Sequence, residues 1–373
     1  MAHSSVSGTS SPLVPTTAIR RLLATVVANP FGTAVSLGLA YLAWTLGFRI
    51  IDWAFVNATW VASDRAGCNP DGACWAFIVN RLPQFAFGFY PEAERWRAWI
   101  VLITPPLLLL LAMAPDFPGR RKLLVGGFCA YPVASFILLS GGVLGLAPVP
   151  SEKWGGLLLT MVVGIGAFVF SFPIAILLAL GRASKLPAIR LIATGFIESW
   201  RGMPLIAILF MSVIMLPLFL PPGVEFPRLT LAMTGITLYS AAYLAEVARG
   251  GLQSVGRGQS EAANALGFGF WAMQGYIIMP QALRAVLPGI VNSAISLLKD
   301  TTYVMVVGLF DLLNIVTAAL SDPAWLGLAT EGYVFVGVVF WSLCFGLSQV
   351  SARMERDSER AQSRAPNGGR KAQ

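Results

Sequence analysis

The sequence has 373 residues, of which 56% are hydrophobic and only 12% are charged, with a formal net charge of +8 at pH 7. Because soluble domains carry about 25% charged residues, this composition indicates an integral membrane protein, and the basic residues lie scattered between apolar blocks, as membrane topology requires and nucleic-acid binding does not. The single histidine, His3, excludes a histidine-based metal site or catalytic triad.

The chain opens with a polar segment, residues 1–30, which we expect to be a cytoplasmic tail. Apolar runs then follow, each near the ~20 residues that cross the hydrocarbon layer of a bilayer. We therefore predict an all-α integral membrane protein with about eight transmembrane helices. The predicted spans are 33–55, 97–114, 122–147, 155–181, 202–220, 229–248, 285–308 and 331–350. The charged end, 351–373, is expected to be a second cytoplasmic tail.

The distribution of lysine and arginine predicts the orientation of these spans. With the N-terminus inside, most of the 26 basic residues fall in cytoplasmic loops or tails, as the positive-inside rule requires. Both termini are then cytoplasmic, and the segment 258–280 is cytoplasmic as well. The loop at 56–96 lies on the outer, periplasmic side.

The outer loop at 56–96 contains two cysteines in a turn-rich stretch. Cys68 and Cys74 enclose an Asn-Pro-Asp-Gly-Ala run, which favours a tight reversal of the chain. An oxidising exterior permits a disulfide between them. Two free thiols are the alternative.

Two carboxylate–guanidinium pairs occur at predicted span ends. Glu198 and Arg201 are three residues apart, and so are Glu246 and Arg249, so each pair can form an ion pair on a helix. The run 201–204, Arg-Gly-Met-Pro, also permits a helix break. We interpret both pairs as structural ion pairs; for the first, a hinge with an anchor and an anchor alone remain alternatives.

The predicted span 285–308 carries a polar stripe in an apolar background. Polar groups inside a bilayer normally face the bundle interior or a wet cavity, so the stripe is a candidate translocation pathway or gate. An ion pair at its end could bind a zwitterionic substrate or serve as a self-satisfied structural pair. The candidate residues are Asn292, Ser293, Ser296, Lys299, Asp300 and Thr301.

The stretch 258–280 predicts a helix, a glycine turn and a second segment. Residues 259–266 are mostly good helix formers, and Gly267 suits the left-handed residue that ends a helix. The following segment is aromatic and amphipathic, and Pro280 is expected to end it. The element is either a docking knob on the membrane face or an ordinary interfacial connector.

The spacing within this stretch resembles the EAA motif of ABC importer permeases. Glu261, Ala262 and Ala263 are followed after three residues by Gly267, then after nine by Ile277, and then by Met279-Pro280. Met279 stands where the family has leucine, a mild change between unbranched apolar residues. The resemblance covers roughly 155–350 and implies that the element is a coupling helix that enters a groove on an ATPase subunit.

Shorter segments point to the polar amino acid uptake group of that family. Residues 198–205 resemble its E-x-x-R-G-T-P-L segment with Met203 replacing threonine, and 299–302 resemble its K-D-T-S run with Thr302 replacing serine. The run 89–97 and the extra N-terminal spans resemble the M permeases of general L-amino acid systems.

The resemblance implies a type I ABC importer permease bundle. Its five core spans would occupy 155–350, with the coupling loop at 249–284, and three extra spans would occupy 31–154. In this fold, Glu246 and Arg249 either pair structurally or contact the ATPase directly.

The implied function is that of the permease subunit of an ATP-driven importer, which moves L-amino acids across the bacterial inner membrane by alternating access. The implied partners are a second homologous permease, two ABC ATPase copies, a periplasmic amino-acid-binding protein and membrane lipid. The sequence contains no G-x-x-x-x-G-K-[ST] loop, so ATP and Mg²⁺ are expected on the ATPase, with no cofactor, metal or catalytic residue in this chain.

Two other classes of protein are alternatives to this expectation. An ion-coupled secondary amino acid carrier would show an isolated carboxylate at the membrane centre or an inverted repeat. A membrane-embedded enzyme would need clustered acids, bases or metal ligands. The acidic residues of this chain lie mostly at the ends of the predicted spans. This distribution favours neither the ion-coupled carrier nor the membrane-embedded enzyme.

Overall fold

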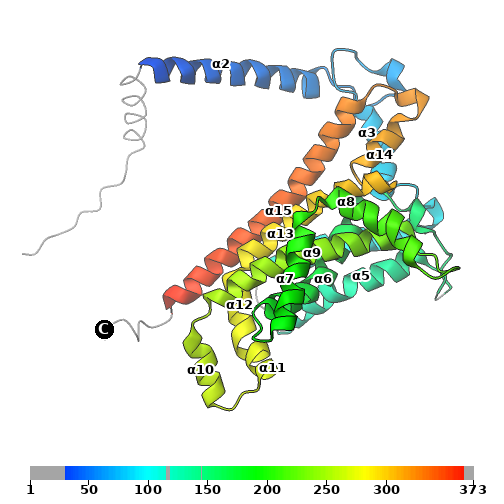
Figure 1. Cartoon of the computed structure of the whole chain (residues 1–373). Coiled ribbons are helices and arrows are strands. Elements are labelled where there is room, and N and C mark those ends of the chain that lie inside the picture. The colour runs from blue at the N-terminus through cyan, green and yellow to red at the C-terminus, as the bar shows by residue number, and fades with distance from the viewer. Residues whose placement is uncertain (1–29, 115–117, 144, 365–373) are drawn as a thin grey trace, which may run out of the picture. The chain divides into compact units, whose positions relative to one another are not determined.

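The computed structural model describes residues 30–114, 118–143 and 145–364 (Figure 1). The tail expected at 1–30 and the end of the tail expected at 351–373 therefore lie largely outside the described residues. The chain divides into two compact units between Ala76 and Phe77. Within the described ranges the structure is helical, and strand pairing is limited to isolated bridges.

The first unit contains one apolar helix followed by a compact loop. Helix α2 (Pro30–Ile51) continues into the π-helical turn η1 (Asp52–Val56), and the 3₁₀ turn η2 (Arg65–Gly67) follows. The 26 residues Phe31–Val56, which contain the first predicted span, are long and apolar enough to cross a membrane. The indole of Trp75 donates a hydrogen bond to the Ala54 carbonyl (2.7 Å) and thereby ties the loop to the end of this span.

The second unit is a helical bundle. Its first half contains α3, which starts just before the division (Trp75–Phe87), η3 (Glu92–Glu94), α4 (Arg95–Met113), α5 (Arg120–Ser140), η4 (Ser151–Lys153), α6 (Gly156–Arg182), α7 (Pro187–Gly202), α8 (Leu205–Phe210), η5 (Met211–Met215), η6 (Leu216–Phe219) and α9 (Arg228–Ser254). Its second half contains α10 (Arg257–Ala265), α11 (Phe270–Met273), η7 (Gln274–Ile278), α12 (Met279–Ala285), α13 (Leu287–Asp300), η8 (Thr301–Val307), α14 (Asn314–Leu320), η9 (Pro323–Trp325) and α15 (Ala329–Arg364).

The prediction of an all-α membrane protein with about eight transmembrane helices is confirmed. Among the described residues, seven helices are long and apolar enough to span, and a broken pair raises the number to eight. The predicted span 122–147 was too long, because α5 ends at Ser140, where Gly141 and Gly142 adopt positive φ values of 64° and 77°.

The predicted span 202–220 is not one straight helix. The segments Pro187–Gly202 and Leu205–Phe219 meet at an angle of 107°. Met203 between them is extended (φ −101°, ψ 140°), because a residue that precedes proline avoids the helical region. The break permitted by the run 201–204 is therefore present, and the helical part before it, α7, extends well ahead of the predicted start.

Helices α3 and α14 were not expected from the sequence. Both lie between the predicted spans, and α3 contains Pro83. From Phe77 onward α3 packs on the connection between α13 and α15, with Phe77 beside Trp325 (ring centroids 5.8 Å apart) and Phe85 beside Phe335 (5.2 Å).

Helices α6 and α9 form the centre of the bundle. Small residues let neighbouring segments approach closely: a Cβ atom on Gly166 would lie 2.6 Å from Met233 Cε, and one on Gly235 would lie 2.5 Å from Ser212 Oγ. Side chains of α6 and α9 belong to a large buried apolar cluster, which also includes Val101 of α4 and Tyr131 of α5. Two of the three spans predicted within 31–154 are thus built into the cluster that contains α6 and α9.

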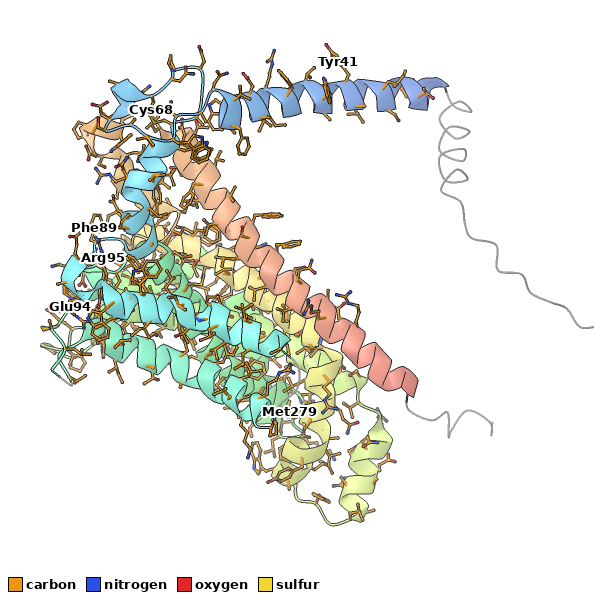
Figure 2. All side chains as sticks on the ribbon, turned by 180° about the vertical axis from the view of Figure 1, so that it is seen from behind. Tyr41, Cys68, Phe89, Glu94, Arg95 and Met279 are labelled. Carbon is orange, nitrogen blue, oxygen red and sulfur yellow. A yellow bond between two sulfur atoms is a disulfide. The ribbon has the colours of Figure 1, made fainter. Side chains whose placement is uncertain are left out.

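A buried arginine fixes the start of α4. Arg97 is fully buried, and its guanidinium lies 2.8 Å from the Glu94 carboxylate. It also donates hydrogen bonds to the carbonyls of Leu138 (3.2 Å) and Ala147 (3.1 Å). Figure 2 labels Glu94 at this corner. Because an unpaired buried charge is costly, these partners explain how the arginine is tolerated and how α4 is locked to the end of α5.

Candidate functional site: the coupling loop and the polar face of α13

The loop that carries the EAA spacing has a regular helix termination. Gly267 has a φ of +78°, as expected. Its amide donates to the Asn264 carbonyl (3.0 Å), and the Phe268 amide donates to the Ala263 carbonyl (3.1 Å). This pair of bonds is a Schellman motif, which satisfies the last carbonyls of α10 and needs a left-handed residue at Gly267.

The spacing between the alanines and the isoleucine of the EAA-like stretch follows from the packing of α10 on the segment after the turn. Ala263 is buried against Met273 and Ile278, and Ile277 packs at the edge of the same small cluster. Glu261 and Ala262 point outward and are exposed. The small third residue of the motif therefore allows α10 to lie against the segment after the turn, whereas the first two face solvent or a partner.

Large apolar side chains project from this loop into solvent. Trp271 is 69% exposed and Tyr276 is 81% exposed, and Leu266, Phe268 and Phe270 are exposed as well. Figure 1 shows α10 and α11 extending beyond the ends of α9 and α12. Exposed apolar patches on a projecting element are typical of protein–protein contact sites.

The prediction that Pro280 ends the segment was wrong. Met279, which Figure 2 labels, opens α12, and Pro280 occupies its first turn, where proline is tolerated because that amide has no intrahelical partner. The chain therefore continues as helix toward α13. Gln281 of α12 donates to the Gln259 side chain (3.2 Å) and so fastens α10 to the bundle.

The polar stripe of α13 forms an exposed face of this chain. Asn292, Ser296 and Lys299 are exposed and lie four and three residues apart, on one side of the helix. Ser293 is half-buried and donates within the helix to the Gly289 carbonyl (2.9 Å). Asp300 is half-buried.

Thr301 does not share that face. It is fully buried, and its hydroxyl donates to the Leu298 carbonyl (2.7 Å). Its methyl group faces α6, where a Cβ atom on Gly164 would lie 3.5 Å away. Thr301 therefore packs two helices together within this chain.

Two tyrosines outside the predicted site residues lie beside the polar stripe of α13. Tyr239 and Tyr243 of α9 have ring centroids 4.8 Å apart, and Asp300 and Tyr303 are near enough to Tyr239 to interact with it electrostatically. The signal was available in the sequence, because two tyrosines four residues apart mark one face of the span 229–248.

The prediction that Glu198 pairs with Arg201 was wrong, because each residue has a different partner. Glu198 pairs with Arg182 of α6 (2.8 Å), and Arg201 lies 3.9 Å from Glu246. The predicted pair of Glu246 with Arg249 is present at 3.0 Å. Arg182, which was not among the predicted ion-pair residues, also pairs with Glu246 at 2.6 Å.

In the outer loop, Cys68 (labelled in Figure 2) and Cys74 are joined by a disulfide. The structure thus contains the expected bond and not two free thiols. Among the described residues no group of three or more His, Cys, Asp or Glu side chains could hold a metal ion.

Comparison with known proteins finds a matching family model and similar chains. Residues 171–358 match the family of binding-protein-dependent transport system inner membrane components. The inner membrane amino-acid ABC transporter permease protein YhdY of Escherichia coli is 44% identical over 86% of this chain and 88% of its own length.

Two further relatives differ in coverage. The glutamate/glutamine/aspartate/asparagine transport system permease protein BztC of Rhodobacter capsulatus is 36% identical over 94% of this chain and 96% of its own. A crystal structure of an amino acid ABC transporter with histidines is 30% identical over 54% of this chain and 92% of that chain, with a TM-score of 0.48.

Proposed function

The chain belongs to the family of binding-protein-dependent transport system inner membrane components, and we propose that it is the permease subunit of an ATP-driven importer that moves L-amino acids across the bacterial inner membrane. It is a multi-pass membrane protein. The amino acid assignment rests on relatives that align along most of the chain and are named as amino acid permeases.

The coupling loop is the observation that carries the proposal. A compact helix–turn–helix unit, closed by Gly267 and packed through Ala263, presents exposed aromatic residues beyond the ends of the spans. A solvent-facing connector gains nothing from such a rigid apolar projection. An ATPase subunit with a complementary groove would bury it.

The proposed cycle needs partners that the chain itself lacks. Two ABC ATPase copies bind ATP and Mg²⁺, and their closure moves the coupling helices of this chain and of a second homologous permease together. The spans then open outward and accept an amino acid from a periplasmic binding protein, and ATP hydrolysis resets them. Both termini of this chain lie in the cytoplasm and the loop at 56–96 in the periplasm.

The polar face of α13 is the proposed pathway or gate. Polar side chains exposed on a span are costly against lipid, so Asn292, Ser296 and Lys299 are covered by the second permease or by a water-filled cavity. Asp300 and the neighbouring tyrosines border that face. The carboxylate of a zwitterionic substrate would contact Lys299, and its ammonium group would contact Asp300.

Uptake by purified components tests the function. Proteoliposomes that contain this chain, its partner permease and the ATPase would be supplied with binding protein and labelled amino acids. The proposal predicts uptake that needs internal ATP and the binding protein. Uptake that instead follows an imposed proton or sodium gradient without ATP would identify an ion-coupled carrier and overturn the proposal.

A further inference from the structure

A five-residue ionic cluster joins three helices of the core at one level of the bundle. Its members are Arg182 of α6, Glu198 and Arg201 of α7, and Glu246 and Arg249 of α9. Beneath it lies a small apolar cluster in which Ile197 of α7 packs with Ala175 of α6 and Leu244 of α9. The three helices are therefore in direct contact where the charges meet.

Arg182 has a distinct place in this cluster. One of its terminal nitrogens lies 2.8 Å from Glu198 Oε1, and the other lies 2.6 Å from Glu246 Oε1. Within the part of the chain that the structure describes, it is the one side chain that forms close ion pairs, under 3 Å, with both α7 and α9. Arg182 is the last residue of α6, so its ion pairs connect α7 and α9 to the end of that helix.

The two helices that Arg182 joins lead to different functional parts. Helix α9 ends at Ser254 and is followed almost at once by α10, the helix of the coupling loop. Helix α7 ends at Gly202, where the chain turns by 107° into the segment that starts at Leu205. A displacement of the coupling loop is thus carried along α9 to a point that is bonded to the broken span.

Arg201 of α7 also contacts α9, at longer distances than the ion pairs of Arg182. Its guanidinium lies 3.9 Å from Glu246 and 5.4 Å from the centre of the Tyr243 ring. Tyr243 borders the polar face of α13 through its contact with Tyr239. The end of α7 therefore touches both the ionic cluster and the edge of the proposed pathway.

We propose that Arg182 is a positioning residue for transport: it keeps the broken span α7–α8 in register with α9, so that movement of the coupling loop changes the pathway. This inference rests on the proposed function. Arginine suits this role because its planar fork can bond two carboxylates at once, whereas the single ammonium of lysine is a point charge.

The proposal predicts a specific defect in Arg182→Gln. The complex should assemble and hydrolyse ATP, but the amount of amino acid moved per ATP should fall by about tenfold, the size of change that a coupling of this kind produces. The KM for the loaded binding protein should stay unchanged, because the cluster does not touch that partner. Arg182→Lys should recover part of the transport.

The matched control is Lys185→Gln, which removes a cation three residues away. Lys185 is exposed, and its side chain forms no ion pair or hydrogen bond with other described residues. This variant should transport and hydrolyse ATP like the wild type. If Arg182→Gln fails to assemble, Glu198→Gln replaces it, because Glu198 is 56% exposed and its loss removes only the bond to α7.

The outcomes separate the two proposals. Absence of ATP-driven uptake by the wild-type complex would overturn the proposed function. Normal wild-type uptake, with Arg182→Gln or Glu198→Gln moving as much amino acid per ATP as Lys185→Gln, would overturn only the role of Arg182. An equal loss of uptake and ATP hydrolysis in Arg182→Gln, without rescue by Arg182→Lys, would reduce Arg182 to a structural residue.

Discussion

Arg81 of α3 and Asp322 at the start of η9, 241 residues apart in the sequence, form an ion pair. The pair joins an N-terminal helix to the connection between α13 and α15. Nearby, the rings of Phe89 and Phe310 pack with centroids 5.4 Å apart. The segment that follows α13 is thus held from outside the matched family region, which begins at residue 171.

Breaking this pair should weaken that attachment moderately. Arg81 and Asp322 are about a third exposed, so solvent screens them, and we expect Arg81→Gln to destabilise the protein by at most about 1 kcal/mol. Thermal unfolding in detergent would measure it. The exchanged variant Arg81→Asp with Asp322→Arg should recover only part of the loss, because Asp322 also accepts a hydrogen bond from the Ala324 amide (2.9 Å). A Tm equal to wild type in Arg81→Gln would show that the pair contributes nothing.

Local patterns in the sequence were enough to predict the helix and the glycine turn within 258–280, because Ala263, Gly267 and Ile277 lie within one short element. The partner of Glu198 could not be read from its neighbours. Arg182 and Glu198 lie on different helices, and only the chain reversal between α6 and α7 brings them to 2.8 Å. Helix α3 was missed for a similar reason, since its apolar face is covered by residues such as Trp325 from the far end of the chain.

The predicted topology can be tested by labelling single cysteines in cells after replacing the four native ones. Asp71→Cys should react with a membrane-impermeant reagent, because the positive-inside rule places its loop outside. Ser5→Cys and Gln373→Cys, whose native residues lie outside the described part of the chain, should react only after permeabilisation. Reaction of the Gln373→Cys variant in intact cells would contradict the eight-span orientation.

Asp311 predicts a pH dependence of stability. Its side chain lies in the connection after the span Leu287–Val307, is fully buried, and accepts hydrogen bonds from the amides of Leu313 (3.0 Å) and Asn314 (3.1 Å). Burial raises the pKa of this carboxyl to about 6, although the two amide bonds oppose the shift. Because the folded state then holds its proton more tightly than the unfolded state, this contribution is complete below pH ~4 and is lost as the pH rises through about 6.

The wild-type protein should therefore gain stability, on the order of 2 kcal/mol, when the pH falls from 7 to 4.5, relative to Asp311→Asn. Unfolding in detergent at several pH values would measure the difference between the two proteins. Asparagine keeps one acceptor oxygen but does not titrate, so parallel pH profiles would contradict the assignment.

Lys299 and Asp300 predict a coupled effect on transport. They are adjacent and interact electrostatically, and an unpaired charge within a membrane costs a few kcal/mol. Lys299→Met and Asp300→Asn should each impair uptake without blocking assembly, and the double variant should be milder than the sum. Lys153→Met, which removes an exposed cation outside the spans, serves as control. Wild-type uptake in either single variant would remove both residues from the pathway.

The central claim is that the loop around Gly267 couples ATP hydrolysis to amino acid transport, and a pair of glycine variants tests it most directly. Gly267 has a φ of +78°, whereas Gly269 has a φ of −67°, and a Cβ atom would meet nothing within 4 Å at either position. Valine strains the backbone only where φ is positive. In the reconstituted complex, ATP-driven uptake should fall strongly in Gly267→Val and remain near wild type in Gly269→Val. Equal ATP-driven uptake in Gly267→Val, in Gly269→Val and in the wild type would contradict the account.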